Sequence, residues 1–301
     1  MRYTKPPLSF NDQLDLLVRR GMSIPDRERA RHYLAHLNYY RLRGYWLPFE
    51  ESTGSGDHCF KAGTSFEDAL SLYVFDRQLR LLLLDAIERV EVSLRTRWAY
   101  VLAMRYGAHA HLRQEIFQSR EKYQRCLEGL QEEIDRSHEA FIDHYQATYT
   151  DPPLPPMWAV CEVMSLGQLS KWFDNLKRHA DRKEIASVFG LDESVLRSFM
   201  HHLTHVRNLC AHHSRVWNRR FTFTMRIPRQ PTRIAAWFNA REDRKLYNTL
   251  VMLGYLLSVI SPDSKWVTHV KQLMAAHLQA RPEEMGFPTN WENLDIWKGA
   301  T

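Results

Sequence analysis

Apolar residues recur at spacings of three and four along most of the chain, which is the period of an amphipathic helix. The longest such run extends from about Ser65 to Arg105. Its apolar positions form one continuous stripe: Phe75, Leu79, Leu83, Ile87, Val90, Leu94, Trp98 and Leu102. A helix of this length is typical of the spine of a helical bundle. Alternating patterns that indicate strands are scarce, so the sequence predicts an all-α fold.

Caps and breaks divide the rest of the chain into shorter helices. A helix at 9–21 begins at a Ser or Asn cap and ends at Gly21. Further helices are expected at 25–49, 113–147, 158–176, 182–190, 192–218, 246–261 and 264–278. The polar residues 51–58 and the sequence TDPPLPP (150–156) predict loops. The last residues, which are rich in Trp, Pro and Asn, predict an extended end.

Composition and charge limit the class of protein. The chain has 301 residues, of which 44% are hydrophobic and 12% aromatic, and this is typical of a globular protein. Lys and Arg number 41 against 35 Asp and Glu, which gives a net charge of +6. This moderate excess favours a polyanionic partner such as nucleic acid without establishing one.

Cysteine spacing and hydropathy indicate the compartment. No two of the four cysteines form a C-x-x-C pair, and the polar N-terminus does not resemble a signal peptide. The longest apolar stretch (250–260) is too short to span a bilayer. We therefore expect a cytoplasmic protein with no membrane partner.

The sequence HVRNLCAHHSRVWNR (205–219) concentrates cationic residues in what otherwise predicts a buried helix. On one continuous helix, the core face would carry Leu203, Val206, Cys210 and Trp217. The opposite side would carry a single polar line: Asn208, His212, Arg215 and Arg219. The small residues between the two faces, Ala211 and Ser214, would permit a close approach by another helix.

This arrangement suits RNA cleavage. Imidazole exchanges protons near neutral pH, and arginine binds phosphate while staying charged. A base such as His212 can take the proton of the 2′-hydroxyl while Arg207 neutralises the phosphorane. The substrate supplies its own nucleophile, so the reaction needs no metal and no other cofactor.

Structural interpretations of the same residues stay open. A line of charges on a helix is usually a solvated face. His201, His202, His205 and His213 fit exposed or hydrogen-bonded structural roles, with His213 at the edge of the core face. A zinc site built from His201, His205 and Cys210 is disfavoured, because it lacks a fourth ligand and the Glu of H-E-x-x-H.

Several stretches resemble one protein family in sequence and in order. They are KPPLSFNDQLDLLVRRGM (5–22), ARHYLAHLNYYRLRGYWLPF (30–49), LYVFDRQLRLLLLDAIERVEVSLRTRWAY (72–100), WAVCEVMSLGQLSKWFDNL (158–176), LTHVRNLCAHHSRVWNRRF (203–221) and MGFPTNWENLDIWK (285–298). The family they resemble is the Abi-like family, of the AbiD/AbiF abortive-infection type. RNLCAHH is an R-N-x-x-x-H match to the R-x(4–6)-H motif of the HEPN ribonuclease superfamily, to which that family is similar.

The resemblance implies a HEPN-like helical bundle with N- and C-terminal helical additions. It implies one Abi-like domain over 1–301, with an N-terminal helical segment (1–60), a core (61–223) with a helical insertion at about 106–150, and a C-terminal helical segment (224–301). It also implies a dimeric, metal-independent endoribonuclease of defence against phage. Arg207, Asn208 and His212 would be catalytic. Supporting or RNA-binding roles would fall to His213, Arg215, Asn218, Arg219, Glu88, Glu91 and Arg95.

The acidic pair on the spine helix and a second region, 38–46, each have a functional and a structural interpretation. Glu88 or Glu91 could orient Arg207 or His212, but Glu91 and Arg95 are also spaced for an intrahelical ion pair worth about 0.3 kcal/mol. The sequence NYYRLRGYW (38–46) could stack on bases, although core packing of its aromatic residues is favoured.

Two functions therefore remain. The intact R-N-x-x-x-H favours an endoribonuclease acting as a homodimer on RNA. The alternative is a non-catalytic RNA-binding HEPN module within a toxin–antitoxin or RNA-regulated complex. A regulatory RNA or an antitoxin is a possible partner in either case.

Overall fold

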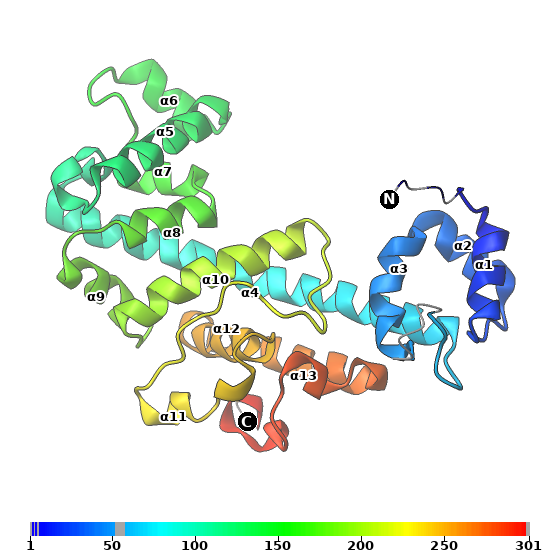
Figure 1. Ribbon diagram of the computed structural model, residues 1–301. Coiled ribbons are helices and arrows are strands. Elements are labelled where there is room, and N and C mark those ends of the chain that lie inside the picture. The colour runs from blue at the N-terminus through cyan, green and yellow to red at the C-terminus, as the bar shows by residue number, and fades with distance from the viewer. Residues whose placement is uncertain (1, 3, 5, 52–57, 299–301) are drawn as a thin grey trace. The chain divides into compact units, whose positions relative to one another are not determined.

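The structure, a computed structural model, describes residues 2, 4, 6–51 and 58–298. Every regular element in these ranges is a helix, and the β-pairing there is confined to isolated bridges such as Glu50 with Phe60 (Figure 1). The predicted all-α fold is therefore confirmed. The described residues contain no helix that is both long enough and apolar enough to cross a membrane.

The chain forms two compact units. The first comprises residues 1–79 and 272–281, and the second comprises residues 80–271 and 282–301. The spine helix α4 (Phe66–Tyr106) and the helix α13 (Trp266–Ala276) each contribute residues to both units.

The first unit is built on three short helices, α1 (Phe10–Arg19), α2 (Arg27–His36) and α3 (Tyr39–Trp46). Ser9 caps α1 in a reciprocal capping box with Asp12, as the sequence predicted. The three helices and the start of α4 bury apolar side chains against one another. These side chains include Leu14, Leu17, Leu34, Leu42 and Trp46 from the three helices and Phe66 from α4.

The prediction of a single helix over 25–49 is wrong, because the structure has two helices there, α2 and α3. The chain breaks after α2 because Asn38 adopts a left-handed conformation, with φ of 36°. Its side-chain oxygen then accepts a hydrogen bond of 2.9 Å from the Tyr40 amide, which starts α3. Asp26 caps α2 in place of an initiating Pro25. Most of the loop expected at 51–58, residues 52–57, lies outside the described residues.

In the second unit, the apolar stripe of α4 is buried as predicted. The side chains of the stripe between Leu83 and Leu102 are each at most 2% exposed. The other helices with residues in this unit include α5 (Arg120–Arg136), α6 (Ala140–Thr148), α7 (Met157–Val163), α8 (Leu166–Asp174), α9 (His179–Ser187), α10 (Glu193–Ala211), α11 (Thr232–Ala235), α12 (Tyr247–Ile260) and α14 (Asp295–Lys298). The loop predicted at 150–156 is present between α6 and α7.

Several predicted segments of this unit differ from the structure. The helix expected at 113–147 is divided into α5 and α6. The helix expected at 158–176 is divided into α7 and α8, because Ser165 forms a new capping box with Gln168. The extended end contains short helical turns, in which Trp291 and Trp297 pack against Phe287.

Candidate functional site

The candidate site lies at the C-terminal end of α10. Asp192 caps the start of this helix, and its inner face buries Leu196, Phe199, Leu203, Val206 and Cys210. The predicted core face is thus confirmed for Leu203, Val206 and Cys210. Burial of this face fixes which side of the last turn is directed away from the core.

The helix ends at Ala211 and does not continue to residue 218. His212 is the C-cap, and His213 adopts the left-handed conformation with φ of 55°. The amide of Ser214 donates to the Leu209 carbonyl (2.8 Å) and the amide of His213 to the Cys210 carbonyl (3.1 Å). These two bonds form a Schellman motif with histidine where glycine is usual. The predicted helical line through Arg215 and Arg219 is therefore wrong.

Burial explains why the chain turns here. Val216 and Trp217 are adjacent residues, and they are 0% and 1% exposed. A continued helix would place Trp217 on the core face but rotate Val216 about 100° away from it. The turn at His213 lets both side chains reach the core.

Arg207, Asn208 and His212 occupy the last turn and the C-cap. Asn208 and His212 are exposed, and Arg207 is half-buried. The Arg207 guanidinium donates a hydrogen bond of 3.3 Å to the side-chain oxygen of Asn208, whose backbone carbonyl accepts from the His212 amide. Asn208 thus links the cation to the residue that carries the imidazole.

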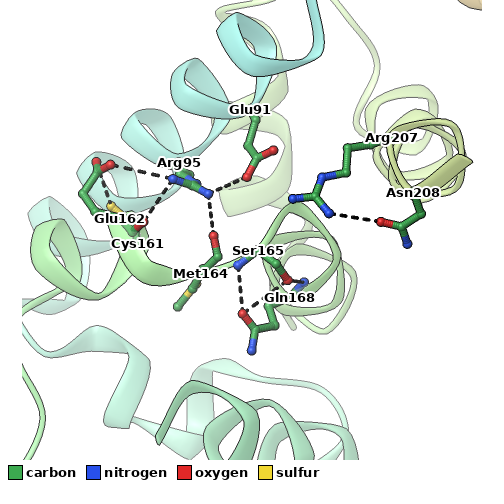
Figure 2. Close-up of polar contacts among 9 residues, drawn as sticks. All are labelled: Glu91, Arg95, Cys161, Glu162, Met164, Ser165, Gln168, Arg207 and Asn208. Atoms are coloured by element: carbon green, nitrogen blue, oxygen red, sulfur yellow. Dashed lines mark hydrogen bonds and ion pairs between the residues drawn. The ribbon is translucent and has the colours of Figure 1, made fainter. Parts of the chain in front are cut away.

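The helix α8 lies beside α10 and sets the surroundings of Arg207. A β-carbon at Gly167 would lie 3.2 Å from the methyl group of Thr204, so the two helices approach closely at this point. Arg207 lies three residues further along α10. In Figure 2 its side chain extends from α10 toward the side of the view that holds Ser165 and Glu91, and a hydrogen bond joins its guanidinium to Asn208. Within the described part of the chain, no carboxylate forms an ion pair with Arg207.

The segment after the helix holds the other predicted cations. Arg215 lies over the ring of Trp217 at 6.0 Å, and Arg219 donates a hydrogen bond of 3.2 Å to the Arg215 carbonyl. Asn218, with φ of 46°, accepts from the Lys245 ammonium at 2.8 Å. Lys245 is a cation of this region that sequence patterns did not single out. His213 is exposed and forms the turn, which places it outside the core face.

The acidic residues on α4 have different settings. Glu91 forms an ion pair with Arg95, and both side chains are mostly buried, at 12% and 16% exposed. Arg95 also donates to the carbonyls of Glu162 (3.1 Å) and Met164 (2.6 Å), which end α7 (Figure 2). Arg95 therefore holds α7 against α4. Glu88 is exposed, and no contact of the described residues joins it to Arg207 or His212.

A family match covers Arg207, Asn208 and His212 of this site. The Abi-like protein family matches residues 32–218, which is more than half of the chain. The chain belongs to the Abi-like protein family. The matched range includes α10 and the turn that follows it, and it ends at Asn218. No curated protein and no solved structure matches the chain significantly. Membership in the Abi-like family suggests a role in abortive infection defence.

The Abi-like chain has two further histidines on α10 that the structure distinguishes. His202 is buried, and its Nδ1 donates to the Phe223 carbonyl (2.7 Å) while its Nε2 accepts from the Thr249 hydroxyl (2.8 Å). Burial lowers the pKa of His202 from 6.5 to about 4, so it is a neutral structural residue. This confirms the structural interpretation of His202.

His205 is the residue that sequence reasoning placed in the structural class and that the structure places beside a site cation. Its ring packs against Phe223, and its Nε2 is buried without a hydrogen-bond partner. Burial lowers its pKa, and the positive charge of Arg219 lowers it further. The sequence feature that could have associated His205 with the site is its spacing of seven residues from His212, which is about two helical turns. In the described residues of this Abi-like protein, no cluster of His, Cys, Asp or Glu could hold a metal ion.

Proposed function

We propose that this Abi-like protein is an endoribonuclease of abortive infection defence that cuts RNA without a metal ion. The observation that carries the proposal is that Arg207, Asn208 and His212 are linked at the end of α10 and that Arg207 forms no ion pair with a described carboxylate. Asn208 and His212 are exposed at the end of α10, and no described carboxylate neutralises Arg207. By contrast, Arg95 and Asn218 are engaged by Glu91 and Lys245.

The chemistry follows from the groups present. His212 takes the proton from the ribose 2′-hydroxyl, whose oxygen forms a bond to phosphorus. Arg207 binds the phosphate and neutralises the charge that develops on it, while Asn208 holds the guanidinium in place. The bond from phosphorus to the 5′-oxygen breaks, and that oxygen receives a proton. The products are a 2′,3′-cyclic phosphate and a 5′-hydroxyl end.

We further propose that a second copy of the chain completes this site. One copy supplies one exposed imidazole, and the departing 5′-oxygen needs a proton donor on the far side of the phosphorus. Ala211 and His212 are both exposed, and a two-fold axis beside them would bring a second His212 opposite the first. The partners are therefore RNA and a second subunit, with a regulatory RNA or an antitoxin as a means of restraint.

The direct test is cleavage of single-stranded RNA by purified protein with and without EDTA. We expect cleavage in EDTA, with 2′,3′-cyclic phosphate or 3′-phosphate ends, and we expect it to be abolished by His212→Ala and Arg207→Ala. The control is His144→Ala, which removes an exposed histidine from α6. Loss of activity on chelation that a divalent ion restores would contradict the metal-free mechanism.

A growth assay in cells provides a second readout. Expression of the wild-type chain should arrest growth, and His212→Ala should relieve the arrest while His144→Ala should not. RNA binding by the wild-type chain without cleavage would instead identify the non-catalytic RNA-binding alternative.

A further inference from the structure

The first unit contains a pocket of about 640 Å³ beside α1, the end of α2 and α3. Its described lining combines aromatic rings and cations with apolar residues, and it includes no carboxylate. The residues that carry the argument are Phe10, Arg20, His36, Tyr39, Tyr40 and Arg43. This pocket shares no residue with the site at the end of α10.

The aromatic residues of the 38–46 sequence have divided roles. Tyr45 and Trp46 are buried, so the favoured packing interpretation is confirmed for these two. Tyr40 is 71% exposed, which packing does not explain. The ring of Tyr39 packs on Trp46 at 5.0 Å and meets the ring of Tyr40 at 6.0 Å and an angle of 77°. The two tyrosines therefore form an aromatic corner that is fixed on one side and open on the other.

Two guanidinium groups lie beside this corner. Arg20 donates a hydrogen bond of 3.3 Å to the Tyr39 hydroxyl, and Arg43 lies 3.4 Å from the ring nitrogens of His58. Burial raises the pKa of Tyr39, the charges of Arg20 and Arg43 lower it, and the charge of Glu50 raises it.

The nearby carboxylate of Glu50 contacts His58 and forms no ion pair with either of these arginines. It lies 2.9 Å from Nδ1 of His58, to which it is paired. Among the residues that the structure describes, neither Arg20 nor Arg43 forms an ion pair with a carboxylate. The pocket therefore offers two cations whose charge is available to an anion.

We propose that this pocket binds a nucleotide, with its base stacked on Tyr40 and its phosphate held by Arg20 and Arg43. An open aromatic face suits a planar base, and guanidinium groups suit phosphate. Pockets of about 300–1,000 Å³ accommodate ligands of this size. A free nucleotide and a nucleotide within single-stranded RNA present the same chemistry. Binding here does not depend on the proposed cleavage reaction.

The test measures binding to the full chain carrying His212→Ala, so that cleavage cannot consume the RNA. Calorimetry with AMP and fluorescence anisotropy with a short single-stranded oligouridylate distinguish the two sources of the nucleotide. Tyr40→Ala should weaken binding roughly tenfold, and Tyr40→Phe should retain it, because stacking needs the ring and not the hydroxyl. Arg43→Ala should also weaken binding roughly tenfold, with a smaller salt dependence.

The control variants replace the same residue types, one arginine and one tyrosine, at positions outside the pocket. Arg19→Ala removes an exposed arginine next to Arg20 on α1, and Tyr149→Ala removes a tyrosine that is 54% exposed in the second unit. Neither residue lines the pocket, so neither change should alter binding. Thermal melting confirms that each variant folds, and Arg43→Gln replaces Arg43→Ala if that variant does not.

AMP binding that depends on Tyr40 and Arg43 would establish a free-nucleotide site. RNA binding with the same dependence and no AMP binding would establish a site for a nucleotide of an RNA chain. The proposal is overturned if neither ligand binds, or if Tyr40→Ala and Arg43→Ala bind as well as Arg19→Ala. Because cleavage is measured separately, a failure here leaves the function proposed for α10 intact, and the reverse also holds.

Discussion

The backbone amide of His212 donates a hydrogen bond of 2.9 Å to the carbonyl oxygen of Asn208, and this bond closes the last turn of α10. The bond uses only main-chain atoms of both residues. It therefore fixes the position of the His212 backbone while the exposed imidazole contributes little to the stability of the helix. A residue held in this way can be replaced without damage to the fold.

The first prediction compares two residues of the motif segment. His212→Ala should change the free energy of unfolding by less than about 1 kcal/mol, because the side chain is exposed. Trp217→Ala should lower it by about 3–5 kcal/mol, because the ring is 1% exposed. Urea unfolding measures both. A His212→Ala protein that cannot fold would move His212 from the candidate site into the structural class.

The second prediction concerns the left-handed conformation of His213. His213→Gly should be more stable than His213→Ala by about 1 kcal/mol, because only glycine adopts positive φ without a steric cost. Both changes remove the imidazole, so their difference isolates the backbone. At His212, where φ is −88°, the glycine variant should be no more stable than the alanine variant. Thermal melting of the four proteins gives the comparison, and equal stabilities at 213 would refute it.

The third prediction concerns the buried ion pair on α4. Arg95→Ala should lower the free energy of unfolding by about 3 kcal/mol, because it leaves the Glu91 carboxylate and the α7 carbonyls without their donor. Arg125→Ala is the control, because it breaks an exposed i,i+4 pair with Glu121 and should cost less than about 0.5 kcal/mol. Similar losses in the two variants would show that Arg95 has no structural role.

The fourth prediction is a pH dependence caused by His202. Its pKa is about 4 in the folded protein and 6.5 when unfolded, so only the unfolded state binds the proton between these values. The stabilisation is complete above about pH 6.5 and decreases as the pH falls toward 4, by about 1.4 kcal/mol per pH unit. His202→Gln should reduce this slope. Chemical unfolding at several pH values tests it, and an unchanged slope would contradict the assignment.

The fifth prediction addresses the shared site. If two His212 side chains serve one phosphate, mixing wild-type and His212→Ala subunits should lower activity more than dilution does. RNA binding should weaken steeply as salt rises, because arginines from both subunits contact phosphate. Light scattering and cleavage run at the same protein concentration test the assembly. Full activity in a monomer would exclude the shared site.

The sequence by itself determined the fold class and the spine helix, and it identified the polar residues at the end of α10 as a candidate site. The buried stripe of α4 and the Ser9 cap of α1 depend on residues within a turn or two of each other, so periodicity and capping predict them. The spacing of Glu91 and Arg95 likewise indicated their ion pair as one of two alternatives, and the structure contains that pair. The motif residues Arg207, Asn208 and His212 were identified from sequence, and their catalytic role stays a prediction.

Only the tertiary structure decided where helices stop and which polar residues the fold uses. No glycine marks the end of α10, which is set by burial of Val216 and Trp217 in the core. The attachment of Arg95 to the carbonyls that end α7 joins residues almost seventy positions apart. The exposure of Tyr40 and the burial of Trp46 on the same helix depend on how α3 packs within its unit. Each of these outcomes arises from contacts between distant segments, and local periodicity carries no information about them.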